Sequence, residues 1–258
     1  MAKALILFFS QGGHTRILAE RISARLQAIG MNSDLIEITE GKPSDMDEYK
    51  IVFIGSPVYY YREPLIWEEY IKGLPDMTGK AGFIFSTYGA EKKKHVDKIM
   101  NDNLSLYFAR KGLKILSADG TVCEDTWTPL KKAGKGFGRP DQDDLRGFDE
   151  YIERIIKDFK SGKIDRAIYD FSLKTKKHKL GNWFWKLFIR FCPKPHVDNS
   201  NCTKCGLCVK SCPVNNIRSG ETIRIHSDCI KCYECERVCK NNGIKVNWKL
   251  IDAFVPKK

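Results

Sequence analysis

The sequence predicts an α/β protein in two parts, a five-stranded parallel sheet with intervening helices and then a small α+β domain. Three observations support this. Short apolar runs alternate with amphipathic helical patterns in the first half, and eight of the ten cysteines fall between Cys202 and Cys239. Residues 1–160 are electrically balanced, whereas residues 161–198 and 199–258 each carry a net charge of +6. We therefore expect one domain at 1–160, a basic aromatic connector at 161–198 and a cysteine-rich domain at 199–258.

Five runs rich in β-branched and aromatic residues predict the strands. They are Ala4–Phe9, Asp34–Ile38, Ile51–Gly55, Ala81–Ser86 and Leu113–Ser117. Four of these runs are almost entirely apolar, as in parallel strands covered on both faces, and the more mixed second run suits a sheet edge.

Helical patterns lie between and after these strands. They cover Thr15–Ile29, Pro64–Ile71, approximately Lys92–Arg110, and Asp141–Phe159. Gly30 is the expected C-cap of the first helix, and Asp141 with Asp144 signals the start of the last. Because strands and helices alternate, we expect right-handed connections and a ligand site beyond the carboxyl ends of the strands.

The cysteines form two runs with the same spacing. The first run is Cys202, Cys205, Cys208 and Cys212, followed by Pro213, and the second is Cys229, Cys232, Cys235 and Cys239. This spacing is typical of two [4Fe–4S] clusters, in which the fourth cysteine of each run binds the other cluster. We call Cys202, Cys205, Cys208 and Cys239 the first quartet, and Cys229, Cys232, Cys235 and Cys212 the second quartet. Structural zinc fits poorly, because zinc sites use paired cysteines separated by a longer loop.

Three turns could hold a further group at the sheet edge. The turn Ser10-Gln11-Gly12-Gly13-His14-Thr15 follows the first strand, and small residues there let backbone amides converge on an anion at a helix N-terminus. It matches neither the ATP nor the dinucleotide fingerprint. The segments 55–61 and 86–90 follow the third and fourth strands, and both offer aromatic faces suited to a planar ring system.

On these motifs, the first domain resembles the flavodoxin family and residues 199–258 resemble bacterial-type two-cluster ferredoxins. Nearly the whole chain is similar to flavodoxin–ferredoxin fusion proteins of anaerobes. The resemblance implies a flavodoxin-like sheet followed by a ferredoxin-like domain, with FMN and two [4Fe–4S] clusters as cofactors. The implied FMN-binding residues are Ser10, Gly12, Gly13, His14, Thr15, Pro57, Val58, Tyr59, Tyr60, Thr87, Tyr88 and Gly89.

We therefore predict an iron–sulfur flavoprotein that moves electrons between the clusters and FMN. It is expected to be an oxidoreductase acting on a small acceptor or donor, or alternatively an electron carrier between proteins; a redox sensor is a third interpretation. An open flavin face would favour the enzyme, and a flavin covered by the ferredoxin domain would favour the carrier. No side chain is needed as a covalent catalyst, because the cofactors carry the chemistry.

The expected partner is a ferredoxin-type or acidic electron carrier, and a nucleic acid partner is not expected. With no export signal and no long apolar stretch, we expect a cytoplasmic protein. The apolar segment Asn182–Phe191 is expected to pack between the domains, with a partner or membrane surface as the alternative. The run Lys174–Lys179 is expected to be a solvated linker, or alternatively to steer an acidic redox partner or anionic lipid.

Several isolated features have two interpretations. The tract Lys131–Arg139 is expected to be a surface loop, although it could receive a nucleotide phosphate, and Trp127 could anchor it. Cys123 and Cys192 have no partner at ligand spacing and are expected to be structural. His95, His196 and His226 are isolated in the sequence and are expected to be surface histidines or histidines with satisfied hydrogen bonds.

Overall fold

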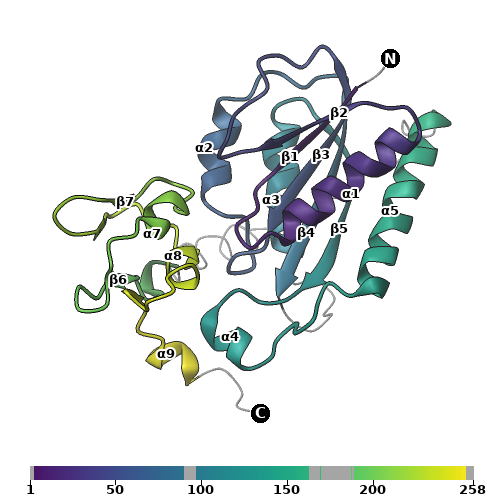
Figure 1. Cartoon of the computed structure of the whole chain (residues 1–258). Coiled ribbons are helices and arrows are strands. Elements are labelled where there is room, and N and C mark those ends of the chain that lie inside the picture. Colours follow the sequence, from purple (N-terminus) through teal and green to yellow (C-terminus); the bar gives the residue numbers. More distant parts are fainter. Residues whose placement is uncertain (1–2, 90–96, 163–168, 170–186, 188, 254–258) are drawn as a thin grey trace.

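The computed structural model of the chain describes residues 3–89, 97–162, 169, 187 and 189–253 (Figure 1). Five strands form the larger sheet: β1 (Lys3–Phe8), β2 (Ser33–Glu37), β3 (Tyr49–Pro57), β4 (Ala81–Gly89) and β5 (Lys114–Cys123). Their order is β2-β1-β3-β4-β5 and every pair is parallel. This is the flavodoxin-like order, so the predicted fold class is confirmed.

Two layers of helices cover this sheet. Helices α1 (His14–Ala28) and α5 (Gln142–Lys160) pack on one face, where Ile6 and Phe8 of β1 point. Helices α2 (Ile66–Lys72) and α3 (Lys98–Ala109) pack on the other face, where Leu5 and Leu7 point. The alternation along β1 explains why this strand is apolar throughout, since both of its faces are buried.

Strand lengths differ from the sequence prediction at the carboxyl ends. The fifth strand was expected to end at Ser117, but β5 continues to Cys123 because Ser117–Cys123 pair with Phe83–Gly89 of β4. Thr87, Tyr88 and Gly89 are therefore strand residues rather than loop residues. A short helix, α4 (Thr128–Lys132), also interrupts the connection that was expected to be a loop. Helix α3 begins at Lys98, and residues 92–96 of the expected helix lie outside the described residues.

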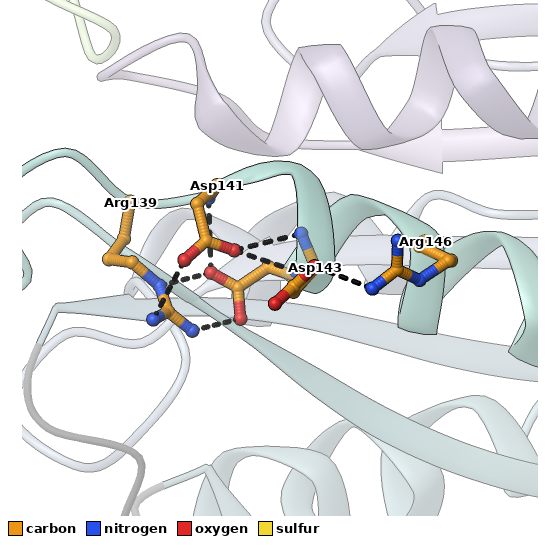
Figure 2. A network of polar contacts seen from close by, with 5 residues as sticks. Arg139, Asp141, Asp143 and Arg146 are labelled. Atoms are coloured by element: carbon orange, nitrogen blue, oxygen red, sulfur yellow. Dashed lines mark hydrogen bonds and ion pairs between the residues drawn. The ribbon is translucent and has the colours of Figure 1, made fainter.

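The start of α5 confirms the predicted capping signal. The Asp141 side chain accepts hydrogen bonds from the backbone N–H groups of Asp143 and Asp144, and the Asp144 side chain accepts one from the Asp141 N–H. Arg139 forms ion pairs with Asp141 and Asp144, while Arg146 pairs with Asp143 (Figure 2). The guanidinium at the end of the tract Lys131–Arg139 is thus engaged in fixing a helix start.

The cysteine-rich domain is built from short elements. They are β6 (His196–Val197), α7 (Leu207–Lys210), β7 (Ile217–Arg218), β8 (Arg224–Ile225), α8 (Glu234–Arg237), β9 (Ile244–Lys245) and α9 (Lys249–Asp252). β6 pairs with β9 and β7 pairs with β8, both antiparallel. The domain lies beside α4 and the turns of the larger sheet (Figure 1).

Candidate functional site

The turn between β1 and α1 offers a row of backbone amides. Gly13 is the N-cap of α1 with φ of 88°, a left-handed conformation that glycine adopts without strain. The backbone N–H groups of residues 11–15 have no acceptor among the described residues. Five such amides at a helix N-terminus suit an anionic group such as the phosphate of FMN.

Side chains complete this turn. The Nδ1 atom of His14 is buried without a hydrogen-bond partner in the described part of the chain, and burial lowers the pKa of His14. Ser10 Oγ accepts the Arg16 N–H at 3.0 Å, and Thr15 Oγ1 lies 2.8 Å from Thr87 Oγ1. The orphaned imidazole nitrogen is a further group that a bound phosphate or water would satisfy.

The turn after β3 is held in an uncommon conformation. Tyr59 and Arg62 exchange two backbone hydrogen bonds of 2.8 and 3.0 Å, and the residues between them, Tyr60 and Tyr61, have φ of 54° and 63°. Val58 N–H donates to Thr87 O at 2.8 Å, and Tyr59 OH donates to Gln11 Oε1 at 3.3 Å. All three predicted flavin segments therefore meet at one edge of the sheet.

The connection after β5 forms a fourth side of this site, which the sequence prediction missed. A Cβ at Gly89 would lie 2.5 Å from Asp125 Cα, and one at Gly12 would lie 2.9 Å from Thr126 Cγ2. The Asp125 carboxylate accepts the Trp127 N–H at 2.8 Å, and burial raises the pKa of Asp125 to about 6. The connection between β5 and α5, residues 124–141, is long for an α/β protein, and long connections are often functional, so its length is the sequence signal for this role.

The second quartet surrounds a cavity. Cys212, Cys229, Cys232 and Cys235 all line it, together with apolar side chains that include Ile217, Ile225 and Ile230. Burial raises the pKa of Cys232 to about 12, and the charges of Cys229 and Cys212 act in the same direction. The structure therefore brings Cys212, from the first run, to the cysteines of the second run. A cavity lined by four thiols and apolar residues fits an iron–sulfur cluster.

The first quartet is partly assembled in the same way. The pKa of Cys208 is raised by burial and by the nearby Cys239 and Cys202, whereas Cys205 is exposed. The last cysteine of each run accepts a backbone N–H, Asn216 to Cys212 Sγ at 3.2 Å and Gly243 to Cys239 Sγ at 3.1 Å. All ten cysteines are free thiols. In the described part of the chain, no three His, Cys, Asp or Glu side chains converge as ligands of a single metal ion; the thiols of the second quartet instead stand around a cavity, as the ligands of a multi-atom cluster do.

The two runs are also repeats in backbone conformation, at an offset of 27 residues. Positive φ angles recur at Lys204 and Lys231 (55° and 56°), at Gly206 and Tyr233 (74° and 59°), and at Asn215 and Asn242 (49° and 52°). Helix α7 corresponds to α8, and strand β7 to β9. The second run thus folds as the first does.

The cysteine-rich domain packs directly on the predicted flavin turn. The hydroxyl of Tyr60 donates to Lys231 O at 3.2 Å and lies 3.2 Å from the hydroxyl of Tyr233. Trp127 contacts both tyrosine rings edge-on, with centroid separations of 4.7 and 5.6 Å, and Trp248 lies against Tyr233. Trp127 therefore anchors its connection, as expected, but it does so on the other domain.

Polar contacts join the same two parts. Arg237 donates to Gln11 O at 2.9 Å, and Gln11 Nε2 donates to Ser211 O at 3.4 Å. Thr128 Oγ1 donates to Glu236 Oε2 at 2.8 Å. The β1–α1 turn and the turn after β3 are thus both in contact with the cysteine-rich domain.

The described part of the connector reaches this interface. Ile189 is buried with Tyr60, Tyr233 and Trp248, which confirms interdomain packing at that position, although Phe191 is 73% exposed. Residues 182–186 and 188 of the apolar segment, the run Lys174–Lys179 and His95 lie outside the described residues. Cys123 and Cys192 are buried, and His196 and His226 are exposed. No helix in the described ranges is long and apolar enough to cross a membrane.

Comparison with known proteins finds a family match within each of the two parts of the chain. Residues 5–127 match the family model of the flavodoxin domain, and residues 195–218 match the 4Fe-4S binding domain. No curated protein matches the chain. One solved structure that resembles the chain is a flavodoxin of Streptococcus pneumoniae, at 19% sequence identity over 59% of this chain and 96% of its own, with a TM-score of 0.45. Another is an archaeal flavodoxin, at 17% sequence identity over 61% of this chain and 99% of its own, with a TM-score of 0.45. Rubredoxin oxygen:oxidoreductase of Desulfovibrio gigas is similar at 17% identity over 62% of this chain and 36% of its own, with a TM-score of 0.46.

Proposed function

Because this chain joins a flavodoxin domain to a 4Fe-4S binding domain, we propose that it is an iron–sulfur flavoprotein that transfers electrons between two [4Fe–4S] clusters and FMN. The observation that carries the proposal is the contact between the two predicted cofactor sites. Tyr60, in the predicted flavin turn, touches Tyr233, which lies between two predicted cluster ligands. Electron transfer requires such proximity, because its rate falls steeply with distance.

The residues of the flavin site would divide the work of binding FMN. The amides of residues 11–15 and His14 Nδ1 would hold the phosphate, since they lack acceptors or partners among the described residues. Pro57–Tyr60 and Thr87–Gly89 would flank the ring system, and Ser10 and Thr15 would position the turn. When bound, FMN supplies a carrier that exchanges one or two electrons.

The two quartets would hold the clusters. The family match covers only the first cysteine run, and the proposal of a second cluster rests on the cavity lined by the second quartet and on the 27-residue repeat. The amides of Asn216 and Gly243 would donate to the ligand sulfurs, an interaction that stabilises thiolate charge and influences reduction potential.

The packing of the domains favours the electron carrier over an enzyme with an open flavin. Tyr60 is buried against the cysteine-rich domain, so it is engaged on the side where a small acceptor could otherwise approach. Oxidoreductase activity on a small molecule has no comparable observation behind it. The expected partner is therefore another redox protein.

The proposal is tested by cofactor content and by an anaerobic titration. The purified protein should contain one FMN and about eight iron atoms, since each cubane holds four. A low-potential protein donor should reduce both flavin and clusters, whereas NADH should reduce neither. Cluster-like iron without bound flavin would refute the proposal, and rapid bleaching by NADH would make the protein a nicotinamide-linked enzyme instead.

A further inference from the structure

The two halves of the cysteine repeat differ in what covers them. In the first half, Thr203, Lys204 and Leu207 are exposed. Their equivalents 27 residues later, Ile230, Lys231 and Glu234, are buried. Ile230 belongs to the apolar core of the flavodoxin domain. Equivalent faces of one repeat are therefore an internal interface in one copy and free surface in the other.

Lys231 shows how specific the internal interface is. Its ammonium donates to the carbonyl oxygens of Arg190 at 2.9 Å and Cys192 at 2.7 Å, and also to that of Ile189. It thereby ties the second cysteine run to the end of the connector. Lys204, at the same place in the first run and with the same backbone φ, points its charge to solvent instead.

Tyr233 makes the same contrast with Gly206. Both residues are left-handed, with φ of 59° and 74°, a conformation that favours glycine. Tyr233 adopts it while its hydroxyl donates to Pro193 O at 3.0 Å and meets Tyr60. Surrounding contacts hold such a backbone in place, and those of the Tyr233 hydroxyl are with the connector and the predicted flavin turn.

We propose that the second quartet is the inner cluster site, which exchanges electrons with the flavin site through the Tyr60–Tyr233 contact, and that the first quartet is the outer site, at which an acidic electron-transfer protein docks. This inference rests on the proposed function. Beyond that function, it specifies the order in which the outer site, the inner site and the flavin site exchange electrons, and it specifies the surface on which the partner docks.

The surface of the first quartet has the chemistry for such a partner. Cys205 and Leu207 are exposed, the latter at 39%, and the lysines Lys204, Lys210 and Lys240 are exposed around them. Asp198, which directly follows β6, forms an ion pair with Lys245, so its negative charge is already compensated. A small apolar centre with a basic rim suits a transient complex with an acidic protein, because opposite charge accelerates encounter.

The electrons balance along this path. Each molecule of reduced partner gives up one electron at the outer site and leaves oxidised by one electron. Two partner molecules are consumed for each two-electron reduction of the flavin, and the accompanying protons come from solvent. In the reverse direction, two oxidised partner molecules each leave with one electron.

Matched ligand variants test the order. Cys202→Ser and Cys229→Ser occupy equivalent positions, so each should remove one cluster and halve the iron content. A photoreduced acidic [2Fe–2S] ferredoxin serves as the donor probe in stopped-flow and freeze-quench EPR experiments. In C229S we expect an EPR signal from the outer cluster while the flavin stays oxidised. In C202S we expect both the inner cluster and the flavin to respond at least tenfold more slowly than in the parent. Parent-like flavin reduction in C202S would overturn the proposal.

Charge variants test the surface without touching a ligand. Lys204→Glu should lower both the association rate and the calorimetric affinity for oxidised ferredoxin by roughly tenfold at low salt. Lys50→Glu should leave both within about twofold of the parent, because this exposed residue stands at the start of β3, at the end of the sheet opposite to the turns. Lys194, whose charge acts on Cys229 of the second quartet, tests the alternative that the partner docks beside the second quartet. A larger effect in Lys194→Glu than in Lys204→Glu would contradict the assignment, as would no effect in either.

A titration with dithionite distinguishes failure of this inference from failure of the proposed function. Dithionite is small and should reduce flavin and clusters in the parent and in all lysine variants. If the parent fails this test, the proposed function is wrong. If the parent passes and the lysine ranking fails, only the order and the docking surface are wrong.

Discussion

Replacing Tyr233 by glycine should loosen the cysteine-rich domain from the flavodoxin domain. Tyr233 is 3% exposed and packs against Tyr60, Trp127 and Trp248. Tyr233→Gly removes these contacts and both hydroxyl hydrogen bonds, but it leaves all eight proposed ligands in place. It also restores the residue that occupies the equivalent position in the first run, Gly206.

The magnitude follows from two opposing effects. Truncating a buried aromatic side chain costs about 3–5 kcal/mol, and releasing a side-chain-bearing residue from a left-handed backbone returns about 1–2 kcal/mol. The net loss is about 1–4 kcal/mol, so the detached fraction should rise roughly 5- to 700-fold, at 1.4 kcal/mol per factor of ten. Tyr233→Phe removes only the hydroxyl bonds and should cost about 1 kcal/mol, or roughly fivefold.

Hydrogen exchange measured by mass spectrometry provides the assay. Exchange should accelerate by these factors in residues 59–62 and 189–192, which the interface covers, and remain unchanged in the core strands β1 and β3. Iron content serves as the control, since it should equal that of the parent in both variants. Unchanged exchange in Tyr233→Gly with intact iron would refute the view that this side chain holds the domains together.

Three further predictions concern the flavodoxin domain. Gly12→Ala should weaken FMN binding about tenfold in a fluorescence titration, because its methyl group would meet Thr126 Cγ2 at 2.9 Å, whereas Gly41→Ala, with open space around it, should not. Asp125→Asn should raise the melting temperature at neutral pH. The pKa of Asp125 is raised to about 6 in the folded chain, so ionisation of this carboxyl destabilises the fold as the pH rises through about 4 to 6, by at most roughly 3 kcal/mol. The stability advantage of the variant over the parent should therefore shrink near pH 5. Asp141→Ala should cost about 1 kcal/mol in denaturant unfolding through loss of the α5 cap, with equal stability of variant and parent counting against the capping role.

Much of the fold was predictable because local patterns and burial agree. The buried strands β1 and β3 are apolar on both faces, and the capping box of Asp141 is a local signal that requires no tertiary knowledge. The ends of β4 and β5 were not predictable in this way. Ser117–Cys123 contains Asp119 and Gly120, which do not favour strands, and it is extended because β4 supplies a partner along its whole length.

In the candidate site too, residues with a local sequence signal were predictable and residues placed by tertiary contacts were not. The residues of the turns after β1 and β3 could be chosen from sequence because glycine, hydroxyl and aromatic residues stand directly after apolar strands. Asp125 could not, since its burial arises from the close approach of its backbone to Gly89. The contact between Tyr60 and Tyr233 was also not predictable, because 173 positions separate the two residues and neither segment carries a sequence signal for pairing with the other.

The contacts of Gln11 with Ser211 and Arg237 bear on how the protein matures. The flavodoxin domain precedes the iron–sulfur domain in the chain, and domains generally fold as units during synthesis. The β1–α1 turn is therefore complete before the segment that will lie against it has left the ribosome. If FMN binds at this turn as proposed, it could enter during this interval, and the later docking of the cysteine-rich domain would then slow its escape. The order of the two domains along the gene would in this way set the order in which the cofactors are installed.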